Sequence, residues 1–237
     1  MTDVFFRFPH TQHIAWLGSE LPRDDKVLSS AEVDYLLSDS VVVEEKLDGA
    51  NLGFSVGSDN RLRAQNRGQY LPETPVGQFQ RLPEWKAIHG RGLADALGEN
   101  LIAFGEWCAA RHSLEYTLLP DWWLLFDIYD RSEGRFWSTC RRDHLAVRIG
   151  LATVPLVAKG PQTLKTLVDG VSSWKSRYRN GVLAGVVVRR EDETWLDARG
   201  KLVRPDFTQA IGAHWRNRKL EWNRIQYGQI GSGSLVQ

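Results

Sequence analysis

The chain has 237 residues, 42% of them hydrophobic and 25% charged, which is enough to bury the core of one large domain. The 30 Lys and Arg residues nearly balance the 29 Asp and Glu residues. The net charge of +1 therefore excludes a purely electrostatic nucleic-acid binder, although a local basic face stays compatible with it.

Targeting signals and cysteines place the chain in a broad class. No apolar run approaches the roughly 20 residues of a membrane span, so we expect no membrane association. The N-terminus lacks the pattern of a signal peptide. Cys108 and Cys140 fit neither a zinc site nor a disulfide framework. These features predict a protein of the reducing cytoplasm.

The first half of the chain alternates short apolar runs with turn residues. A capping box at Ser29 and Glu32 predicts a helix through Leu37. Residues 76–98 predict two helical pieces, broken at Pro83 and around Gly90 and Gly92. The remaining expected elements are strands over 4–8, 41–46, 52–56, 61–66, 101–108 and 122–129, and a helix over 138–149.

The second half predicts a strand over 154–157, a helix beginning at 161–164 and a hairpin of 182–189 with 194–203. A C-terminal helix is expected over about 206–226, capped by Asp206, with Ile211, Trp215, Trp222 and Ile225 near one face. We expect one domain over 1–230 and a flexible tail over 231–237. Strands joined by short turns outnumber helices, which predicts an α+β fold of antiparallel sheets flanked by helices.

One stretch has unusual charge placement at the end of a buried strand: Glu44-Glu45-Lys46-Leu47-Asp48-Gly49-Ala50-Asn51. Among fixed charges at a strand end, the pKa of a lysine can fall until its neutral amine is a nucleophile. A K-x-D-G match on its own arises by chance, so the rest of a site has to come from other parts of the chain.

Four other stretches carry charges in apolar surroundings. They contribute Arg67, Glu106, Asp127 beside Phe126, and the alternating pair Arg199 and Lys201. Each has a structural alternative: Glu106 pairing with a buried arginine, Asp127 capping a turn, and the last pair forming a solvated strand face. Together they describe a pocket with an amine, carboxylates, an aromatic ring and cations for phosphates. No G-x-x-x-x-G-K-[ST] loop is present, so strand side chains would hold a nucleotide.

The ordered set K-L-D-G-A-N, N-R-G, F-G-E-W, L-L-F-D-I-Y-D, G-V-V-V-R and R-G-K-L-V-R-P spans residues 44–205. It resembles the covalent nucleotidyltransferase superfamily of ATP-dependent RNA ligases, DNA ligases and mRNA capping enzymes. Asn51 and the run G-E-W-C-A-A-R-H-S resemble the RNA ligase branch most. The resemblance implies a nucleotidyltransferase (adenylylation) domain. The residues after Lys201 are too few for the OB-fold of the other branches, so a minimal RNA ligase without an OB-fold is expected.

The resemblance implies a reaction in three steps. Lys46 attacks the α-phosphate of ATP, giving lysyl–AMP and pyrophosphate. The AMP passes to an RNA 5′-phosphate, and a 3′-hydroxyl then displaces it and seals the strand. The implied cofactors are ATP and Mg²⁺ or Mn²⁺. The implied partner is RNA with 5′-phosphate and 3′-hydroxyl ends, and the implied process is RNA repair.

The resemblance also implies a role for each site residue. Glu45 holds the adenine edge, Phe126 stacks on the base and Glu106 binds the ribose hydroxyls. Arg67 and Asn51 lie near the ribose and phosphate. Asn51 also lies near a metal-bound water, and Asp48 supports the metal or the lysine. Arg199 and Lys201 contact the α-phosphate and its developing charge. Candidates for the RNA 5′-phosphate path are Arg111, His112, Arg141 and Arg142, with surface solvation the alternative for the last two.

Two positions depart from the family pattern. Ala184 stands where the family has a glutamate that binds the divalent metal or its waters, so metal use should be weaker. Either the change is an engineered inactivation or the natural protein is impaired. Arg199 replaces a lysine; it keeps the charge but cannot donate a proton at neutral pH. Two alternative functions stay open: a nucleotide- or RNA-end-binding module without full turnover, and a minimal DNA nick ligase.

Overall fold

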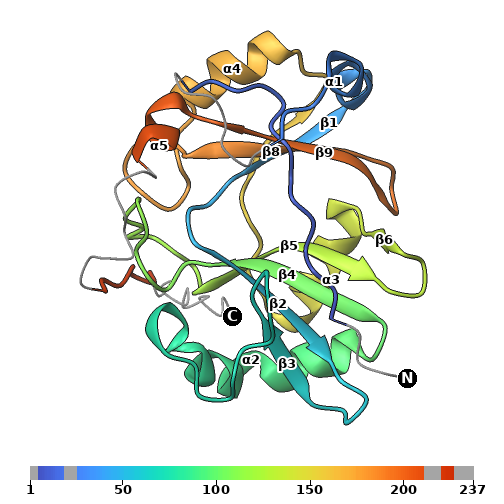
Figure 1. Ribbon diagram of the computed structural model, residues 1–237, viewed down its shortest axis with the longest axis vertical. Coiled ribbons are helices and arrows are strands. Elements are labelled where there is room, and N and C mark those ends of the chain that lie inside the picture. Colours follow the sequence, from blue (N-terminus) through green and yellow to red (C-terminus); the bar gives the residue numbers. More distant parts are fainter. Residues whose placement is uncertain (1–4, 19–25, 211–219, 227–237) are drawn as a thin grey trace, which may run out of the picture.

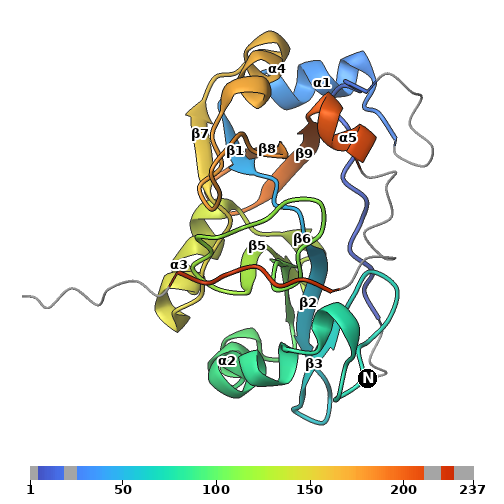
Figure 2. The same ribbon diagram turned by 90° about the vertical axis from the view of Figure 1, so that its left-hand side faces the viewer.

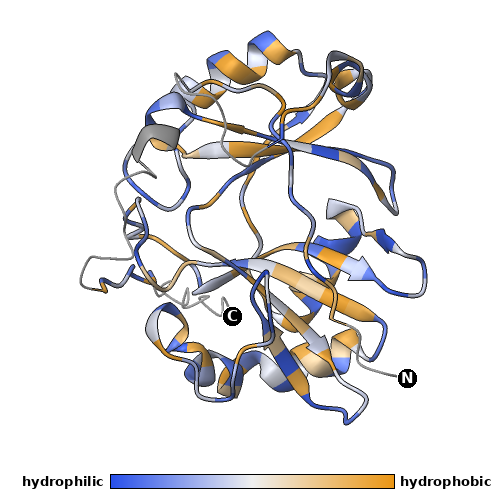
Figure 3. Cartoon of the chain, in the orientation of Figure 1, coloured by the Kyte–Doolittle hydropathy of each residue, from blue (hydrophilic) through white to orange (hydrophobic). Residues whose placement is uncertain are grey.

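Two antiparallel sheets lie one above the other in the computed structural model, which describes residues 5–18, 26–210 and 220–226 (Figure 1). The four-stranded sheet has the order β7-β1-β8-β9 and the five-stranded sheet the order β3-β2-β4-β5-β6. Figure 3 shows apolar residues along the strands of both sheets. The predicted α+β fold with antiparallel sheets flanked by helices is thus confirmed.

The four-stranded sheet is built around a fully buried strand. Its strands are β1 (Val41–Glu45), β7 (Leu156–Gly160), β8 (Gly185–Glu191) and β9 (Leu196–Val203). All five residues of β1 are buried, because β7 and β8 flank it on both sides. Helices α1 (Ser30–Leu37) and α4 (Leu164–Ser173) contribute Leu36, Leu167 and Val171 to its core. The predicted capping box of Ser29 and Glu32 opens α1.

The five-stranded sheet holds the larger, tryptophan-rich core. Its strands are β2 (Ala50–Val56), β3 (Leu62–Gln65), β4 (Leu101–Trp107), β5 (Trp123–Asp130) and β6 (Arg135–Phe136), packed with η1 (Gly77–Phe79), α2 (Leu82–Leu97) and α3 (Thr139–Ile149). Trp85 of α2 stacks on Phe54, with ring centroids 5.2 Å apart, and meets Trp123 edge-on. Such rings bury a large apolar area and hold α2 against the sheet.

Several segments of the chain cross between the sheets. The chain passes from β1 directly to β2 through residues 46–49. A dark blue N-terminal strap, residues 5–18, runs past both sheets in Figure 1. In the strap, the ring of Phe6 stacks on Tyr129 at 3.9 Å, and Ile14 donates its amide to the Lys201 carbonyl at 2.8 Å. The predicted strand is wrong for residues 5–8, which form no strand and pack by their rings instead.

Three helix predictions need correction. α2 continues through Gly90 and Gly92 as one helix, and Pro83 lies in its first turn, where the missing N–H costs no hydrogen bond. α5 covers Pro205–Ala210, so Asp206 lies inside the helix and does not cap it. The predicted helix is also wrong over 220–226, which is extended.

The C-terminal error has a physical cause. Ile211 and Trp215 lie outside the described residues, while Trp222 and Ile225 form isolated bridges with Ala110 and Leu119. Apolar residues three apart fit a helix as well as an extended segment that packs at two points, and only tertiary pairing separates the two.

No helix among the described residues is long and apolar enough to cross a membrane.

Candidate active site

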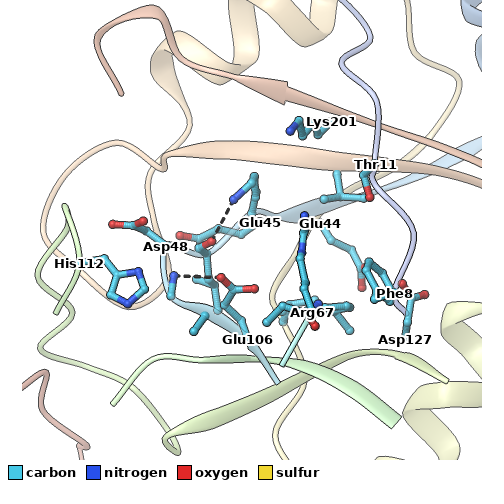
Figure 4. A pocket seen from close by; sticks show the side chains of 18 of the residues that line it. Phe8, Thr11, Glu44, Glu45, Asp48, Arg67, Glu106, His112, Asp127 and Lys201 are labelled. Atoms are coloured by element: carbon cyan, nitrogen blue, oxygen red, sulfur yellow. Dashed lines mark hydrogen bonds between the residues drawn. The ribbon is translucent and has the colours of Figure 1, made fainter. Parts of the chain in front are cut away.

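A pocket with a volume of about 510 Å³ opens between the two sheets (Figure 4). Strands β1, β2, β4, β5, β8 and β9 all contribute side chains to it. It brings together nine residues that were predicted to act in catalysis or to bind the nucleotide or metal: Glu45, Lys46, Asp48, Asn51, Arg67, Glu106, Phe126, Arg199 and Lys201. Ala184 is not among the lining residues.

Lys46 follows the last residue of β1 and lines the pocket. Its backbone amide donates to the Gly185 carbonyl at 2.9 Å, and its Nζ donates to the Leu47 carbonyl at 3.3 Å. Leu47 is buried, which anchors the turn just after the lysine. The amine is therefore presented by a short, held turn and not by a mobile loop.

The Asp48 carboxylate is held by backbone amides. Its Oδ2 accepts hydrogen bonds from the amides of Ser113 and Leu114, both at 2.8 Å. Its own amide donates to the Tyr116 hydroxyl at 2.9 Å. Burial raises the pKa of Tyr116 well above its ordinary value, which keeps that hydroxyl protonated. Asp48 is thus tied to a loop that is distant in the sequence.

Glu106 lies on β4 and accepts the Gly49 amide at 2.9 Å (Figure 4). This backbone contact, and not a buried arginine, is its hydrogen-bond partner among the described residues. Burial raises the pKa of the Glu106 carboxyl, and the charge of Lys46 opposes that rise. The close approach requires glycine, because a Cβ on Gly49 would lie 2.4 Å from the Trp107 carbonyl oxygen.

Two buried acceptors in the pocket lack partners within the described part of the chain. They are Oε1 of Glu45 and Oδ1 of Asn51. The other carboxylate oxygen of Glu45 accepts the Arg177 amide at 2.9 Å, and burial raises the pKa of this carboxyl. Buried polar atoms are normally hydrogen-bonded, so both acceptors are suited to donors of a ligand or to water.

A buried ionic network joins the two sheets beside the pocket. Asp127 of β5 pairs with Arg189 of β8 at 2.8 Å and also with Arg199 of β9. The Arg199 guanidinium lies over the rings of Phe8 and Phe136. Asp127 therefore caps no turn, and Arg199 is not on a solvated strand face; both alternatives are wrong.

The four candidates for an RNA path are separated by the fold. His112 lines the pocket, with its Nε2 2.7 Å from Gln78 Oε1. Arg142 is 1% exposed and pairs with Glu44 at 2.6 Å, so its predicted surface roles are wrong. Arg111 pairs with Glu221 at 2.8 Å, and Arg141 lies over the Trp137 and Trp195 rings.

Several pocket residues were not singled out in the sequence. Phe8 and Thr11 come from the strap, and Gln78 comes from η1. These three side chains are themselves uncharged, whereas a charge inside an apolar run was the signal that identified most of the other residues. The aromatic spacing of Phe6 and Phe8 was visible, but it indicated only a strand.

The surroundings of Ala184 are apolar. It is 1% exposed and clusters with Val203, Phe207 and the half-buried Leu114. Within the described residues, no group of three or more His, Cys, Asp or Glu side chains is placed to hold a metal ion. Mg²⁺ often uses only one or two carboxylates together with substrate phosphates, so Asp48 and Asn51 fit a metal only as partners of a bound nucleotide.

Comparison with known structures identifies the class of fold. A point mutant of the RNA ligase of Naegleria gruberi, solved with ATP and Mn, matches with a TM-score of 0.64 and 16% identity over 87% of this chain. The same ligase with PPi matches with a TM-score of 0.61 and 18% identity over 89% of this chain. The chain spans 58% and 65% of those two structures. The fold of this chain is therefore similar to that of the Naegleria RNA ligase.

The sequence model of the RNA ligase family matches residues 39–203, and the chain belongs to this family. The match begins just before β1 and ends with β9, so it contains every strand of both sheets. No curated protein matches the chain.

Proposed function

We propose that this chain is an ATP-dependent RNA ligase that forms lysyl–AMP at Lys46. The observation that carries the proposal is the convergence, in one pocket between the two sheets, of Lys46 with several carboxylates, an aromatic ring and several further cations. Burying several charged side chains in one cavity costs free energy, and a purely structural role does not explain why they lie together there.

The proposed reaction has three steps, and in each step one bond to a phosphorus atom forms as another breaks. The Lys46 Nζ lone pair forms a P–N bond to the α-phosphorus of ATP, the bond to pyrophosphate breaks, and the amine loses its proton. An oxygen of the RNA 5′-phosphate then attacks the AMP phosphorus and releases the lysine. The RNA 3′-hydroxyl attacks the activated 5′-phosphate, and AMP leaves.

The base and sugar have suitable partners in the pocket. Phe126 offers a ring face, and Glu45 Oε1 is a buried acceptor suited to the amino group of adenine. The raised pKa of the Glu45 carboxyl makes this contact sensitive to pH. Glu106, fixed by the Gly49 amide, is suited to the ribose hydroxyls.

Phosphate charge would be neutralised mainly by Arg67 and Lys201. The side chain of Arg67 reaches the middle of the pocket in Figure 4, and Lys201 enters from β9. Arg199 is paired with Asp127, so we assign it to holding the pocket wall and to balancing charge at the α-phosphate from there. Positioned cations stabilise the charge that develops in phosphoryl transfer.

A divalent ion would be held by the nucleotide phosphates together with Asp48 and Asn51, where it supplies further charge neutralisation. Ala184 offers no oxygen to such an ion or its waters. We therefore expect slow adenylylation by this chain. The same alanine favours the second candidate function, a module that binds a nucleotide or RNA end without full turnover.

The experiment is incubation with α-labelled ATP and Mg²⁺ or Mn²⁺, followed by denaturation and intact-mass measurement. Label on the denatured protein, lost in Lys46→Ala and kept in the exposed control Lys159→Ala, supports the ligase. Label that is absent from the wild type and from Ala184→Glu overturns it and leaves the binding module. Sealing of nicked RNA, nicked DNA and single-stranded RNA then separates an RNA ligase from a DNA nick ligase.

A further inference from the structure

The segment 220–226, here called the C-terminal segment, lies along residues 108–119, here called the active-site loop (Figure 2). In Figure 2 the red segment crosses in front of the green loop. Five backbone hydrogen bonds of 2.8 to 3.2 Å join them: Arg111 to Glu221, Asn223 to Ala109, Arg224 to Tyr116, Leu119 to Arg224 and Gln226 to Leu119, each written from amide to carbonyl.

Asn223 is the buried anchor of this contact and is 2% exposed. Its Oδ1 accepts the Tyr116 amide at 2.8 Å. Its Nδ2 donates to the carbonyls of Cys108 at 2.8 Å and Ala110 at 3.4 Å. One amide side chain thus satisfies three backbone groups that have no helix or sheet partner, and an aliphatic residue of the same size would leave all three unpaired.

The active-site loop is the part of the chain that holds Asp48. The amides of Ser113 and Leu114 bind the Asp48 carboxylate, and the Tyr116 hydroxyl accepts the Asp48 amide. Tyr116 therefore connects the two contacts, because its amide binds Asn223 and its hydroxyl binds Asp48. His112 of the same loop lines the pocket.

We propose that Asn223 is a positioning residue of the active site, which acts through the active-site loop on Asp48 and the adjacent Lys46. The inference rests on the proposed function, since the effect on chemistry presupposes lysyl–AMP formation. Residues 108–119 contain no helix or strand of their own, and their two bridge positions, Ala110 and Leu119, pair with the C-terminal segment. The C-terminal segment consequently supplies the loop with the hydrogen bonds that a regular element would supply to itself.

Another contact explains why one substitution need not release the whole segment. Trp222 lies under the guanidinium of Arg81, 4.3 Å from the ring centroid, and Arg81 also covers Trp122. The exposed pair of Arg111 and Glu221 adds little, as surface ion pairs do. Loss of the Asn223 side chain should therefore loosen the loop while the segment stays attached.

The test compares Asn223→Leu with Asn223→Asp and with Arg224→Ala. The aspartate keeps an acceptor for the Tyr116 amide but loses the N–H donors to the two carbonyls. It replaces the leucine variant in the test if Asn223→Leu does not fold. Arg224 is exposed, and its alanine variant keeps the backbone hydrogen bonds of the segment. The wild-type chain and Ala184→Glu provide two backgrounds for each variant.

Two readouts are measured on folded protein. In hydrogen exchange, amides of residues 113–116 should lose protection in Asn223→Leu, whereas those of β1 and β8 keep it. In single-turnover adenylylation, the rate constant should fall about 10- to 100-fold, because misplaced groups lose most of their effect, while the half-saturating ATP concentration changes by less than about twofold. Arg224→Ala should match the wild type in both readouts.

If the role of Asn223 is merely structural, Asn223→Leu should lower the fraction of protein that reacts and leave the rate constant of that fraction unchanged. This result would overturn the proposal. Unchanged exchange at 113–116 also overturns it. Absence of any adduct in the wild type and in Ala184→Glu overturns the proposed function instead, and exchange then decides whether Asn223 positions the loop.

Discussion

The Arg142 guanidinium on α3 donates a 2.6 Å hydrogen bond to the Glu44 carboxylate on β1, and neither side chain is more than 4% exposed. A second donor of Arg142 reaches the Phe126 carbonyl at 2.7 Å. Glu44 lies two residues before Lys46, and Phe126 lines the pocket. The pair therefore ties β1, the strand that leads to Lys46, to the pocket wall formed by the other sheet.

Removal of one member of this pair should be far more harmful than removal of both. Arg142→Met leaves the Glu44 charge buried, which should lower the free energy of unfolding by about 3–5 kcal/mol. Arg142→Met with Glu44→Gln should recover a large part of that loss. Urea unfolding measures both, with the exposed Arg148→Met on the same helix as control. Equal stabilities of the single and double variants would contradict the assignment.

Glu45→Gln should change the pH dependence of stability. Burial raises the pKa of Glu45 above its ordinary value of 4.5, so the folded state binds more protons than the unfolded state in the window above that value. Wild-type stability is therefore lost as pH rises through this window, by about 1.4 kcal/mol per unit of pKa difference.

The glutamine variant has no proton to lose, so its stability relative to the wild type should rise with pH across the same window. Denaturant unfolding at a series of pH values measures the difference. Parallel curves for the two proteins would show that this carboxyl does not titrate differently on folding. The same variant should discriminate less between ATP and GTP in adenylylation, because the amide side chain both donates and accepts hydrogen bonds.

Ala184→Glu should lower the stability of the protein and raise its activity. The side chain enters an apolar setting of Leu114, Val203 and Phe207, which should cost about 1–3 kcal/mol of unfolding free energy. The added carboxylate should increase the rate of lysyl–AMP formation with Mn²⁺ or Mg²⁺. Ala184→Gln, similar in size but neutral, should carry a similar stability cost without the gain in rate. Equal rates for the two variants would rule out a charge effect.

Two glycine-to-alanine substitutions should differ in outcome: Gly49→Ala should lower activity, and Gly92→Ala should raise stability. Gly49→Ala places a Cβ 2.4 Å from the Trp107 carbonyl oxygen, which pushes the turn after Lys46 away from β4 and disturbs the bond to Glu106. Adenylylation should fall by more than about tenfold. Gly92→Ala, in the interior of α2 with no atom within 4 Å of the new Cβ, should raise stability by about 0.5–1 kcal/mol. Adduct formation and thermal unfolding measure the pair, and an active Gly49→Ala would contradict the geometry.

Prediction from sequence worked best where the signal was local. Apolar runs and turn residues predicted β1, β4, β5 and the β8–β9 hairpin, and Ser29 with Glu32 predicted the start of α1. Charges inside apolar strands identified Glu106 and Asp127 as pocket residues. These signals are reliable because a charge in a buried strand is costly unless it has a partner or a ligand.

Other features depended on contacts between distant segments. Arg142 reads as a surface cation in an amphipathic helix, yet it is buried by Glu44, which lies 98 residues away in the chain. Trp222 and Ile225 have helical spacing but pair with the active-site loop in an extended segment. Local periodicity reports only which residues prefer burial and does not specify what buries them.

The sequence by itself determined the family, the order of the motifs along the chain and the set of charged residues around Lys46. Only the tertiary structure decided that Arg199 pairs with Asp127, that Ala184 lies in an apolar cluster outside the pocket lining, and that Asn223 holds the loop around Asp48. The reason is that a motif is written in consecutive residues, whereas the partners that neutralise a charge or satisfy a buried amide are chosen by the packing of the two sheets.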